Sequence, residues 1–437
     1  MDVAHGLGLV FVCAQTVMVS NCLRAGFTSD QLLTEEGALP TAGQPSIVVA
    51  TDDVHSLTRA SDADLAAGPP KPLKALDAEW TRQGLKSQYD KAYDLRHDAT
   101  ILGIELRQGT HLLPKGARLW DLLEATSDLA ANPQASASEV ASYAGVLHWH
   151  DLLARPLYSC LHRLYRFIEP RKDTTLRRVP TAVISELLHN TALHACWVID
   201  LTRPWLPVLP MADASTSFGF GCTMASLAPS AVRQIADEAG RCGAHFRPLD
   251  LLPGATWKDR RGKCCMLPRR QRDFKHVFSV RAKYPGTPGA LEASAVVLLL
   301  KRLSLKPRWF GHRGVALGDA QAVQSALHKG RTSAPTLRRP IRRAGAMMLA
   351  CDWRYRHPYC PFESNSADPS SRGRRNRGAM RRQEPSLARL IRRLQAANQA
   401  WRQLNRGPYG ESDHEPGSSE SCSSLTQFSV RGGSTSG

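Results

Sequence analysis

Four acidic side chains stand where a folded chain could gather them. Asp213 ends a short apolar run before a small polar turn, and Glu292 lies in the first turn of an expected apolar helix. Asp319 follows an apolar, strand-like run, and Asp368 follows the last expected strand. Four carboxylates from different elements can hold two Mg²⁺ or Mn²⁺ ions about 4 Å apart, an arrangement suited to phosphodiester hydrolysis. We therefore interpret these acids as one two-metal site.

The elements that must position these acids alternate between strand and helix patterns. Residues 207–224 predict a hairpin, because an apolar run, a polar turn and an alternating Phe/Gly segment follow one another. Further strands are expected at 276–280, 309–317 and 353–361, and helices at 181–201, 230–240, 290–303, 320–328 and 336–349. This pattern predicts an α/β domain.

The charge of the chain favours a polyanionic partner. Lys and Arg number 57 against 39 Asp and Glu, a formal charge of +18 over 437 residues. Nucleic acid is the natural partner for such an excess, and a basic but otherwise ordinary protein is the alternative. The stretch 241–272 is irregular and strongly basic, so it is either a contact loop or a disordered insertion. Candidate nucleic-acid-binding residues are Lys258, Arg260, Arg261, Lys263, Lys329, Arg331 and Arg372.

Cysteine usage and hydropathy place the chain inside a cell. Eleven cysteines occur without a CxxC pair, which fits neither a zinc site nor a disulfide framework. Reduced thiols and a cytoplasmic or nuclear location are expected. Residues 7–19 are apolar, but no Lys or Arg precedes them as in a signal peptide. No apolar stretch is long enough to span a bilayer.

The first half of the chain carries a second acidic pair. Two apolar runs within 46–57 flank Asp52 and Asp53, which predicts a hairpin with both carboxylates at its tip. Residues 101–106 predict a strand with a glycine kink. Helices are expected through 116–168, and Ser136 with Glu139 forms a capping-box pattern. Taken alone, the acidic pair is weak evidence for a metal site, since most such pairs lie in exposed turns.

In this order, the first half resembles the second half of a retrotransposon reverse transcriptase palm. Asp52 and Asp53 stand where that family keeps its metal-binding pair, and Leu102-Gly103 where it places the turn that grips the primer. Two departures are Ala50, where the family has an aromatic residue, and the absence of the upstream strand with another metal-binding aspartate. The resemblance therefore implies a truncated, inactive polymerase palm followed by a helical thumb.

The second half resembles the ribonuclease H of retroelement polyproteins. The resemblance rests on Ala212-Asp-Ala-Ser with Gly219, on Asp319 followed by Lys329-Gly-Arg, and on Asn365-Ser-Ala-Asp-Pro-Ser-Ser-Arg372. It implies a mixed five-stranded sheet with flanking helices, two bound metal ions and hydrolysis of the RNA strand of RNA–DNA hybrids. Expected domains are a partial palm (1–110), a thumb or connection (111–202), a ribonuclease H-like domain (203–372) with the insertion 241–272, and a basic helix with a disordered tail (373–437).

Other interpretations stay open at this point. Asp213 and Glu292 lie 292 − 213 = 79 residues apart, so Glu292 could be a surface acid favoured by the helix macrodipole. Asp319 could be an ordinary helix N-cap. His312 and His357 lie near the right elements, but neither sits in a recognisable motif. A non-catalytic nucleic-acid-binding remnant and an active reverse transcriptase are the rival functions, and the sequence predicts no oligomeric state.

Overall fold

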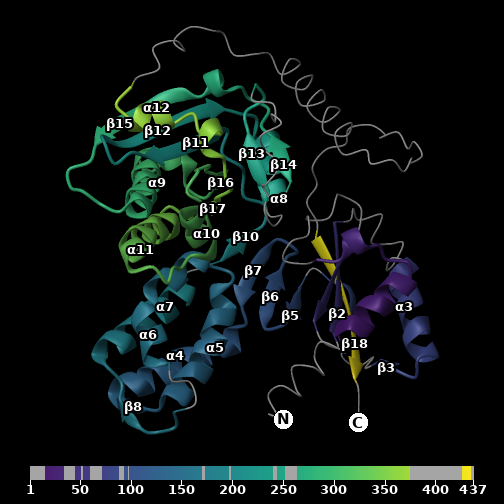
Figure 1. Ribbon diagram of the computed structural model, residues 1–437. Helices are drawn as coiled ribbons and strands as arrows, with labels where there is room; N and C mark the ends of the chain where they lie inside the picture. Colours follow the sequence, from purple (N-terminus) through teal and green to yellow (C-terminus); the bar gives the residue numbers. More distant parts are fainter. Residues whose placement is uncertain are drawn as a thin grey trace, which may run out of the picture. The chain divides into compact units, whose positions relative to one another are not determined.

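The computed structural model divides the chain into two compact units, which are described separately (Figure 1). Unit 1 comprises Met1–Asp121, Cys196–Thr202 and Ser419–Gly437, and unit 2 comprises Leu122–Ala195 and Arg203–Ser418. The structure describes residues 15–33, 45–50, 53–59, 71–87, 93–96, 98–169, 173–195, 198–239, 244–250, 263–374 and 426–434. None of the described helices is long and apolar enough to cross a membrane. The described cysteines are all free thiols.

Unit 1 contains the predicted hairpin around the acidic pair. Strand β1 (Ser46–Ala50) pairs antiparallel with β2 (Asp53–Arg59), so Ala50 faces Asp53 across the tip. Helix α3 (Lys71–Arg82) buries Leu73, Leu76 and Trp80 against this hairpin. The remaining pieces beside it are η1 (Ser29–Gln31), β3 (Lys86–Ser87) and β4 (Tyr93–Arg96).

Two sequence predictions in unit 1 were wrong. The end of the chain is not wholly without structure, because β18 (Thr426–Ser434) pairs with β2, β3 and β4. Residues 101–106 form a hairpin rather than one kinked strand, with β5 (Ala99–Ile101) and β6 (Ile104–Arg107) joined by Leu102 and Gly103. Both turn residues have positive φ, 49° and 79°, as a tight two-residue hairpin turn requires.

The sheet around this turn ends in a strand where a helix was expected. Its order is β10-β7-β6-β5, with β7 at His111–Pro114 and β10 at Ile199–Asp200. The preceding helix α7 (Thr181–Ala195) therefore stops short of the predicted end at residue 201. Helix α4 (Gly116–Ala131) follows β7 and leads the chain into unit 2.

The first part of unit 2 is helical, as predicted. Its elements are β8 (Gln134–Ala135), α5 (Ala137–Asp151), η2 (Arg155–Cys160), α6 (His162–Phe167), β9 (Arg177–Arg178) and α7. The capping box of α5 is present: Glu139 N donates to Ser136 Oγ at 3.2 Å, and Ser136 N donates to Glu139 Oε2 at 2.8 Å. Leucine and valine side chains from α5, α6 and α7 share one core.

The second part of unit 2 is a mixed sheet that begins with three antiparallel strands. Strand β12 (Gly219–Ser226) lies between β11 (Val208–Ala214) and β15 (Lys275–Arg281). Strand β16 (Arg313–Val315) continues the sheet in parallel to β11, since Ala212 N donates to Leu317 O at 3.2 Å. Strand β17 (Arg354–Arg356) then pairs in parallel with β16. The order β15-β12-β11-β16-β17 is the mixed five-stranded sheet expected from the sequence.

The sheet continues past β17 through residues that were expected to be irregular. Strand β13 (His245–Arg247) lies beside the end of the last predicted strand, and Phe246 N donates to Tyr359 O at 3.0 Å. Strand β14 (Cys264–Met266) pairs in parallel with β13. Part of the basic stretch 241–272 is thus an extension of the sheet.

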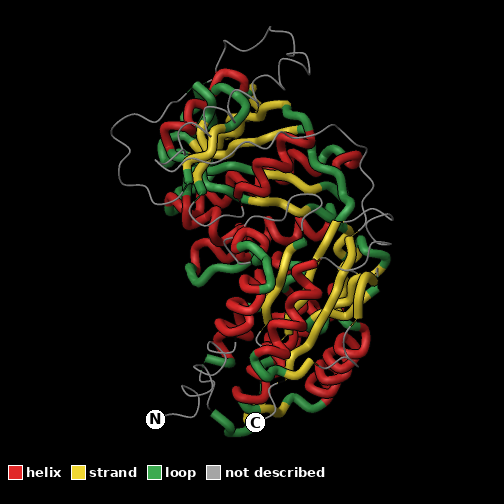
Figure 2. The backbone as a smooth tube through the Cα atoms, turned by 90° about the vertical axis from the view of Figure 1, so that its right-hand side faces the viewer, coloured by secondary structure: helices red, strands yellow, loops and turns green. Residues whose placement is uncertain are grey.

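Helices cover both faces of this sheet (Figures 1 and 2). In β11, Val208 and Ala212 face the core shared with α9, α10 and α11, whereas Leu209 and Met211 face the core shared with α8. A central strand buried on both faces explains the nearly continuous apolar run before Asp213. The helices and turns are α8 (Pro229–Ala239), η4 (Gln271–Asp273), α9 (Pro288–Ser304), η5 (Pro307–Trp309), α10 (Gln321–Lys329), α11 (Pro335–Ala350), η6 (Phe362–Ser364) and α12 (Asp368–Ser371).

Candidate metal centre

Three of the four predicted acids meet at one end of the unit 2 sheet. Asp213, Glu292 and Asp319 each offer a carboxylate oxygen, and these oxygens all lie within 4.8 Å of one another. Asp213 comes from the end of β11, and Asp319 follows the segment that pairs with β11. Because β11 and β16 run in parallel, both acids arrive at the same edge of the sheet.

Glu292 reaches the group from α9 and is not a first-turn residue, contrary to the sequence prediction. The helix begins at Pro288, so Glu292 is its fifth residue and lies in the second turn. Its carboxylate accepts a hydrogen bond from the backbone N–H of Ala214, the last residue of β11. That hydrogen bond joins α9 to the strand that carries Asp213. Glu292 is therefore not a surface acid at a helix terminus.

Burial and mutual repulsion raise the pKa values of all three acids. Burial, followed by the negative charge of Asp319, raises the pKa of Asp213 to about 7. Burial, followed by the charges of Asp213 and Asp319, raises the pKa of Glu292 to about 9. Burial also raises the pKa of Asp319. Clustered carboxylates that repel one another in a desolvated place are suited to a hard divalent cation, which would supply the missing positive charge.

Asn365 holds Asp213 in place and was not singled out from the sequence. It is 1% exposed, and its Nδ2 donates to Asp213 Oδ1 at 3.2 Å and to Ala212 O at 3.3 Å. It is also hydrogen-bonded to Asp319. The sequence singles out Asp368 as a metal ligand and Arg372 as a nucleic-acid-binding residue in the segment 365–372, because carboxylates are the expected metal ligands and amides are not.

Helix α12 brings Asp368 to the edge of this group. A Cβ on Gly221 would overlap the backbone nitrogen of Ser371 and lie 2.7 Å from Ala367 O, so the helix rests directly on β12 at a residue without a side chain. Gly221 faces Asp213 in the strand register. The charge of Asp368 acts on all three clustered acids. Its carboxylate is held by Arg372, whose Nε donates to Oδ1 at 2.8 Å.

The other predicted site residues are spread over several environments. Lys263 forms an ion pair with Glu238 of α8 at 2.9 Å. Arg331 lies over the rings of Tyr158 and Tyr165, 5.3 Å and 5.8 Å from their centres. Lys329 is exposed at the end of α10. Lys258, Arg260 and Arg261 lie outside the described residues.

The acidic pair of unit 1 and the candidate histidines are the remaining residues that the sequence singled out. Asp53 is the first residue of β2, and Asp52 lies outside the described residues. Among the described residues, the acidic group of unit 2 contains no histidine. His357 is buried beside Tyr355, and burial lowers its pKa to about 3.

Comparisons with known proteins give weak likenesses. No family model and no curated protein matches the chain. Among solved structures, ribonuclease H1 from Halobacterium salinarum has 18% identity and a TM-score of 0.21, covering 37% of this chain and 91% of its own. The N-terminal ribonuclease H domain of a Mycobacterium tuberculosis protein has 14% identity and a TM-score of 0.21, covering 39% and 100%.

The foamy viral protease–reverse transcriptase in complex with an RNA/DNA hybrid aligns over more of the chain. It has 11% identity and a TM-score of 0.29, covering 75% of this chain and 59% of its own. Because these TM-scores lie below 0.5, the likenesses support no function for this chain.

Proposed function

We propose that unit 2 is a divalent-metal-dependent nuclease of the ribonuclease H type, which cuts the RNA strand of RNA–DNA hybrids. The observation that carries the proposal is the convergence of Asp213, Glu292 and Asp319 within 4.8 Å. Their convergence at one end of a mixed sheet of order β15-β12-β11-β16-β17 supports it further, because the sequence resemblance implies that architecture.

The acidic side chains are suited to hold Mg²⁺ or Mn²⁺. Asp213, Glu292 and Asp319 would supply carboxylate oxygens, with Asp368 as a fourth candidate ligand. Divalent ions held by these residues would supply a lowered pKa for the attacking water and positive charge near the leaving 3′-oxygen. Asn365 orients Asp213, and Arg372 restrains Asp368.

Other parts of the expected function remain proposals. A polymerase palm in unit 1 is consistent with the β1–β2 hairpin, but its acidic pair is described only at Asp53. A retroelement origin, a nucleic-acid partner and a cytoplasmic or nuclear location also belong to the proposal.

Cleavage of a labelled RNA–DNA hybrid by the full-length chain in Mg²⁺ tests the nuclease. We expect the RNA strand to be cut, an RNA–RNA duplex to stay intact, and EDTA to stop the reaction. Asp213→Asn should reduce the rate by at least about 100-fold, since it removes a ligand from the centre of the group. Asp237→Asn on α8 is the matched control, because its carboxylate pairs with Arg233 on the same helix and should leave the rate unchanged.

Two results would count against the nuclease. Equal cleavage by parent and Asp213→Asn would show that another centre, or a contaminant, cuts the hybrid. Hybrid binding by a folded parent chain that does not cut in Mg²⁺ or Mn²⁺ would favour the non-catalytic binding protein.

A further inference from the structure

Two segments of unit 2 carry basic residues and no acid at all. Residues 152–168 contain Arg155, Arg163 and Arg166, and residues 320–351 contain Lys329, Arg331, Arg338, Arg339, Arg342 and Arg343. Neither segment has an Asp or Glu. An acid-free run of 32 residues (320 to 351) is unusual on a protein surface, where charges of both signs are normally mixed.

The fold packs these two segments tightly against each other. A Cβ on Gly330 would overlap the backbone oxygen of Arg155, and a Cβ on Gly345 would lie 3.1 Å from Pro156 O. Because Gly330 and Gly345 have no side chains, the C-terminal end of α10 and the middle of α11 can rest on η2. Arg331 packs over Tyr158 and Tyr165 across the same junction.

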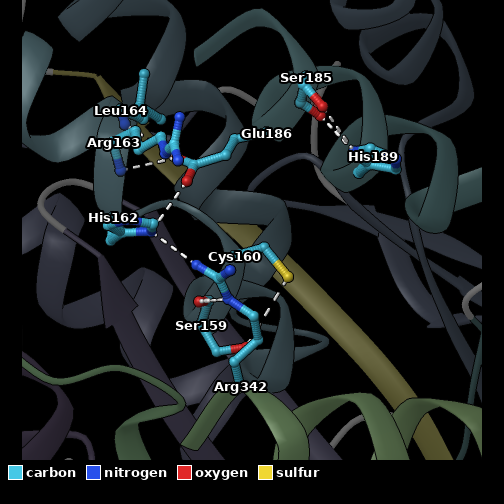
Figure 3. A network of polar contacts seen from close by, with 9 residues as sticks. All are labelled: Ser159, Cys160, His162, Arg163, Leu164, Ser185, Glu186, His189 and Arg342. Carbon is cyan, nitrogen blue, oxygen red and sulfur yellow. Dashed lines mark hydrogen bonds and ion pairs between the residues drawn. The ribbon is translucent and has the colours of Figure 1, made fainter. Parts of the chain in front are cut away.

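His162 marks the place where arginines from both segments meet (Figure 3). Arg342 of α11 lies 2.7 Å from His162 Nδ1, and its Nε donates to Ser159 O at 3.3 Å. Burial, followed by the positive charges of Arg342, Arg338, Arg163 and Arg166, lowers the pKa of His162. Arg163, Arg166 and Arg342 are exposed, and Arg338 is half-buried.

The carboxylate nearest to this meeting point is directed inward. Glu186 of α7 accepts hydrogen bonds from the backbone N–H groups of Arg163 and Leu164 at 2.9 and 3.0 Å. Its other oxygen lies 3.0 Å from His162 Nδ1, and its side chain is only 11% exposed. Because Glu186 is engaged by backbone and imidazole, it forms no ion pair with Arg163 or Arg342 in the part of the chain that the structure describes (Figure 3).

We propose that Arg163, Arg166, Arg338 and Arg342, here called the arginine surface, bind the phosphate backbone of a nucleic-acid duplex. The inference rests on the proposed nucleic-acid substrate and adds a contact surface distinct from the acidic group. Guanidinium groups bind phosphates in a bidentate manner, and these four lie on α6 and on α11, which rests on η2 directly before α6. The surface positions the duplex and reads no bases.

Salt-dependent binding in EDTA tests the arginine surface without any cleavage. The full chain is titrated into a labelled RNA–DNA hybrid at several salt concentrations. The double variant Arg163→Gln/Arg166→Gln should bind about tenfold more weakly at 0.1 M salt. The slope of log K against log salt should shrink by about 1.8, or about 0.9 per lost phosphate contact. Arg166→Gln alone should give about half the change in slope.

A control removes the same charge from another part of unit 2. Arg233 of α8 is exposed and pairs with Asp237 on its own helix. Arg233→Gln, matched to Arg166→Gln, should leave the slope within experimental error of the parent. An unchanged slope in the α6 variants, or an equal loss in Arg233→Gln, would overturn the proposal.

The outcome also separates this surface from the nuclease. If the parent cuts hybrid and the α6 variants bind and cut like the parent, the surface is wrong while the nuclease stands. If the α6 variants lose binding but the folded parent never cuts, the surface stands while the nuclease fails.

Discussion

The amide side chain of Asn365 is hydrogen-bonded to two acids of the centre, Asp213 and Asp319. Asn365 donates from one nitrogen to both the side chain of Asp213 and the backbone of Ala212, and it is almost completely buried. In a site where carboxylates repel one another, a neutral donor can fix the direction of one carboxylate without adding charge. Asn365 therefore acts as a positioning residue.

Asn365→Ala should make the centre a poorer binder of Mg²⁺. Without the amide, the direction of the Asp213 carboxylate is no longer fixed, so the Mg²⁺ concentration for half-maximal cleavage should rise about tenfold. Unfolding should become easier by about 1–3 kcal/mol because a buried acceptor loses its partner. Cleavage rates across a Mg²⁺ series and thermal unfolding measure the two effects.

Asn190→Ala is the control for this substitution. Asn190 is also fully buried and donates to a carboxylate, Asp151 Oδ2, at 3.3 Å, but it lies in the helical part of unit 2. It should lose similar stability with no change in the Mg²⁺ requirement. The same Mg²⁺ requirement in parent and Asn365→Ala would remove Asn365 from the centre.

At the scale of elements, the position of α12 depends on the absence of a side chain in β12. Helix α12 has only four residues, so its own hydrogen bonds cannot fix where it lies. Its backbone rests on Gly221, and Ser279 Oγ of β15 donates to Ser370 O at 2.6 Å. Placement of Asp368 near the other acids is thus a consequence of strand packing.

Gly221→Ala should displace α12 and impair the centre. The added methyl would overlap the backbone of Ser371, and overpacking of this kind costs about 1–3 kcal/mol. We expect a lower unfolding temperature and weaker cleavage at temperatures where the variant is still folded. Thermal unfolding and cleavage assays on the same preparation measure both.

Gly145→Ala gives the opposite expectation for the same chemical change. Gly145 is exposed within α5, and a Cβ there would meet nothing within 4 Å. Alanine should stabilise the chain by about 0.5–1 kcal/mol because it favours the helix over the unfolded state. A Gly221→Ala chain as stable and active as the parent would show that α12 shifts without consequence.

At the scale of the whole molecule, the acidic group makes metal-free stability depend on pH. The folded pKa values of Asp213 and Glu292, about 7 and about 9, lie above their ordinary values of 3.8 and 4.5. Between those limits the folded chain binds more protons than the unfolded chain. The free energy of unfolding therefore falls as the pH rises from about 4 to about 9.

Unfolding temperatures in EDTA should accordingly fall between pH 6 and pH 9, beyond any change seen in Asp213→Asn. Excess Mg²⁺ should raise the unfolding temperature most at the alkaline end, because the ion binds the ionised acids of the folded chain only. Scans of parent and Asp213→Asn at several pH values, with Mg²⁺ or EDTA, measure this. A parent that is most stable at pH 9 in EDTA would contradict the electrostatic description of the site.

Local patterns predicted much of this architecture. Ser136 and Glu139 cap α5 as their spacing indicates, and the run before Asp213 forms the central strand of the sheet. These features depend on neighbours in the sequence, so they can be read from it. The approach of Glu292 to Asp213 followed only from resemblance, because no local rule relates residues 79 positions apart.

Three features were not predicted from the sequence, each for a physical reason. Residues 245–247 form a strand because Tyr359 and residues 264–266 offer backbone partners, and a basic sequence gives no sign of such distant pairing. Leu102 adopts positive φ in the β5–β6 turn although leucine rarely does, so the turn was read as a kink. Asn365 was missed as a site residue, although it begins a segment that carries the resemblance, because a neutral amide is not an expected metal ligand.

The extension of the sheet by β13 also bears on how the chain acquires its fold. His245 of β13 pairs with Tyr359, so the two partners lie 359 − 245 = 114 positions apart in the sequence. Closing so long a loop carries an entropic cost before any contact is gained, so such pairings slow folding. During synthesis, β13 leaves the ribosome well before the partner that completes its hydrogen bonds. The sheet edge beyond β17 can therefore close only after residue 359 has emerged, and until then the apolar face of Phe246 depends on α8 for cover.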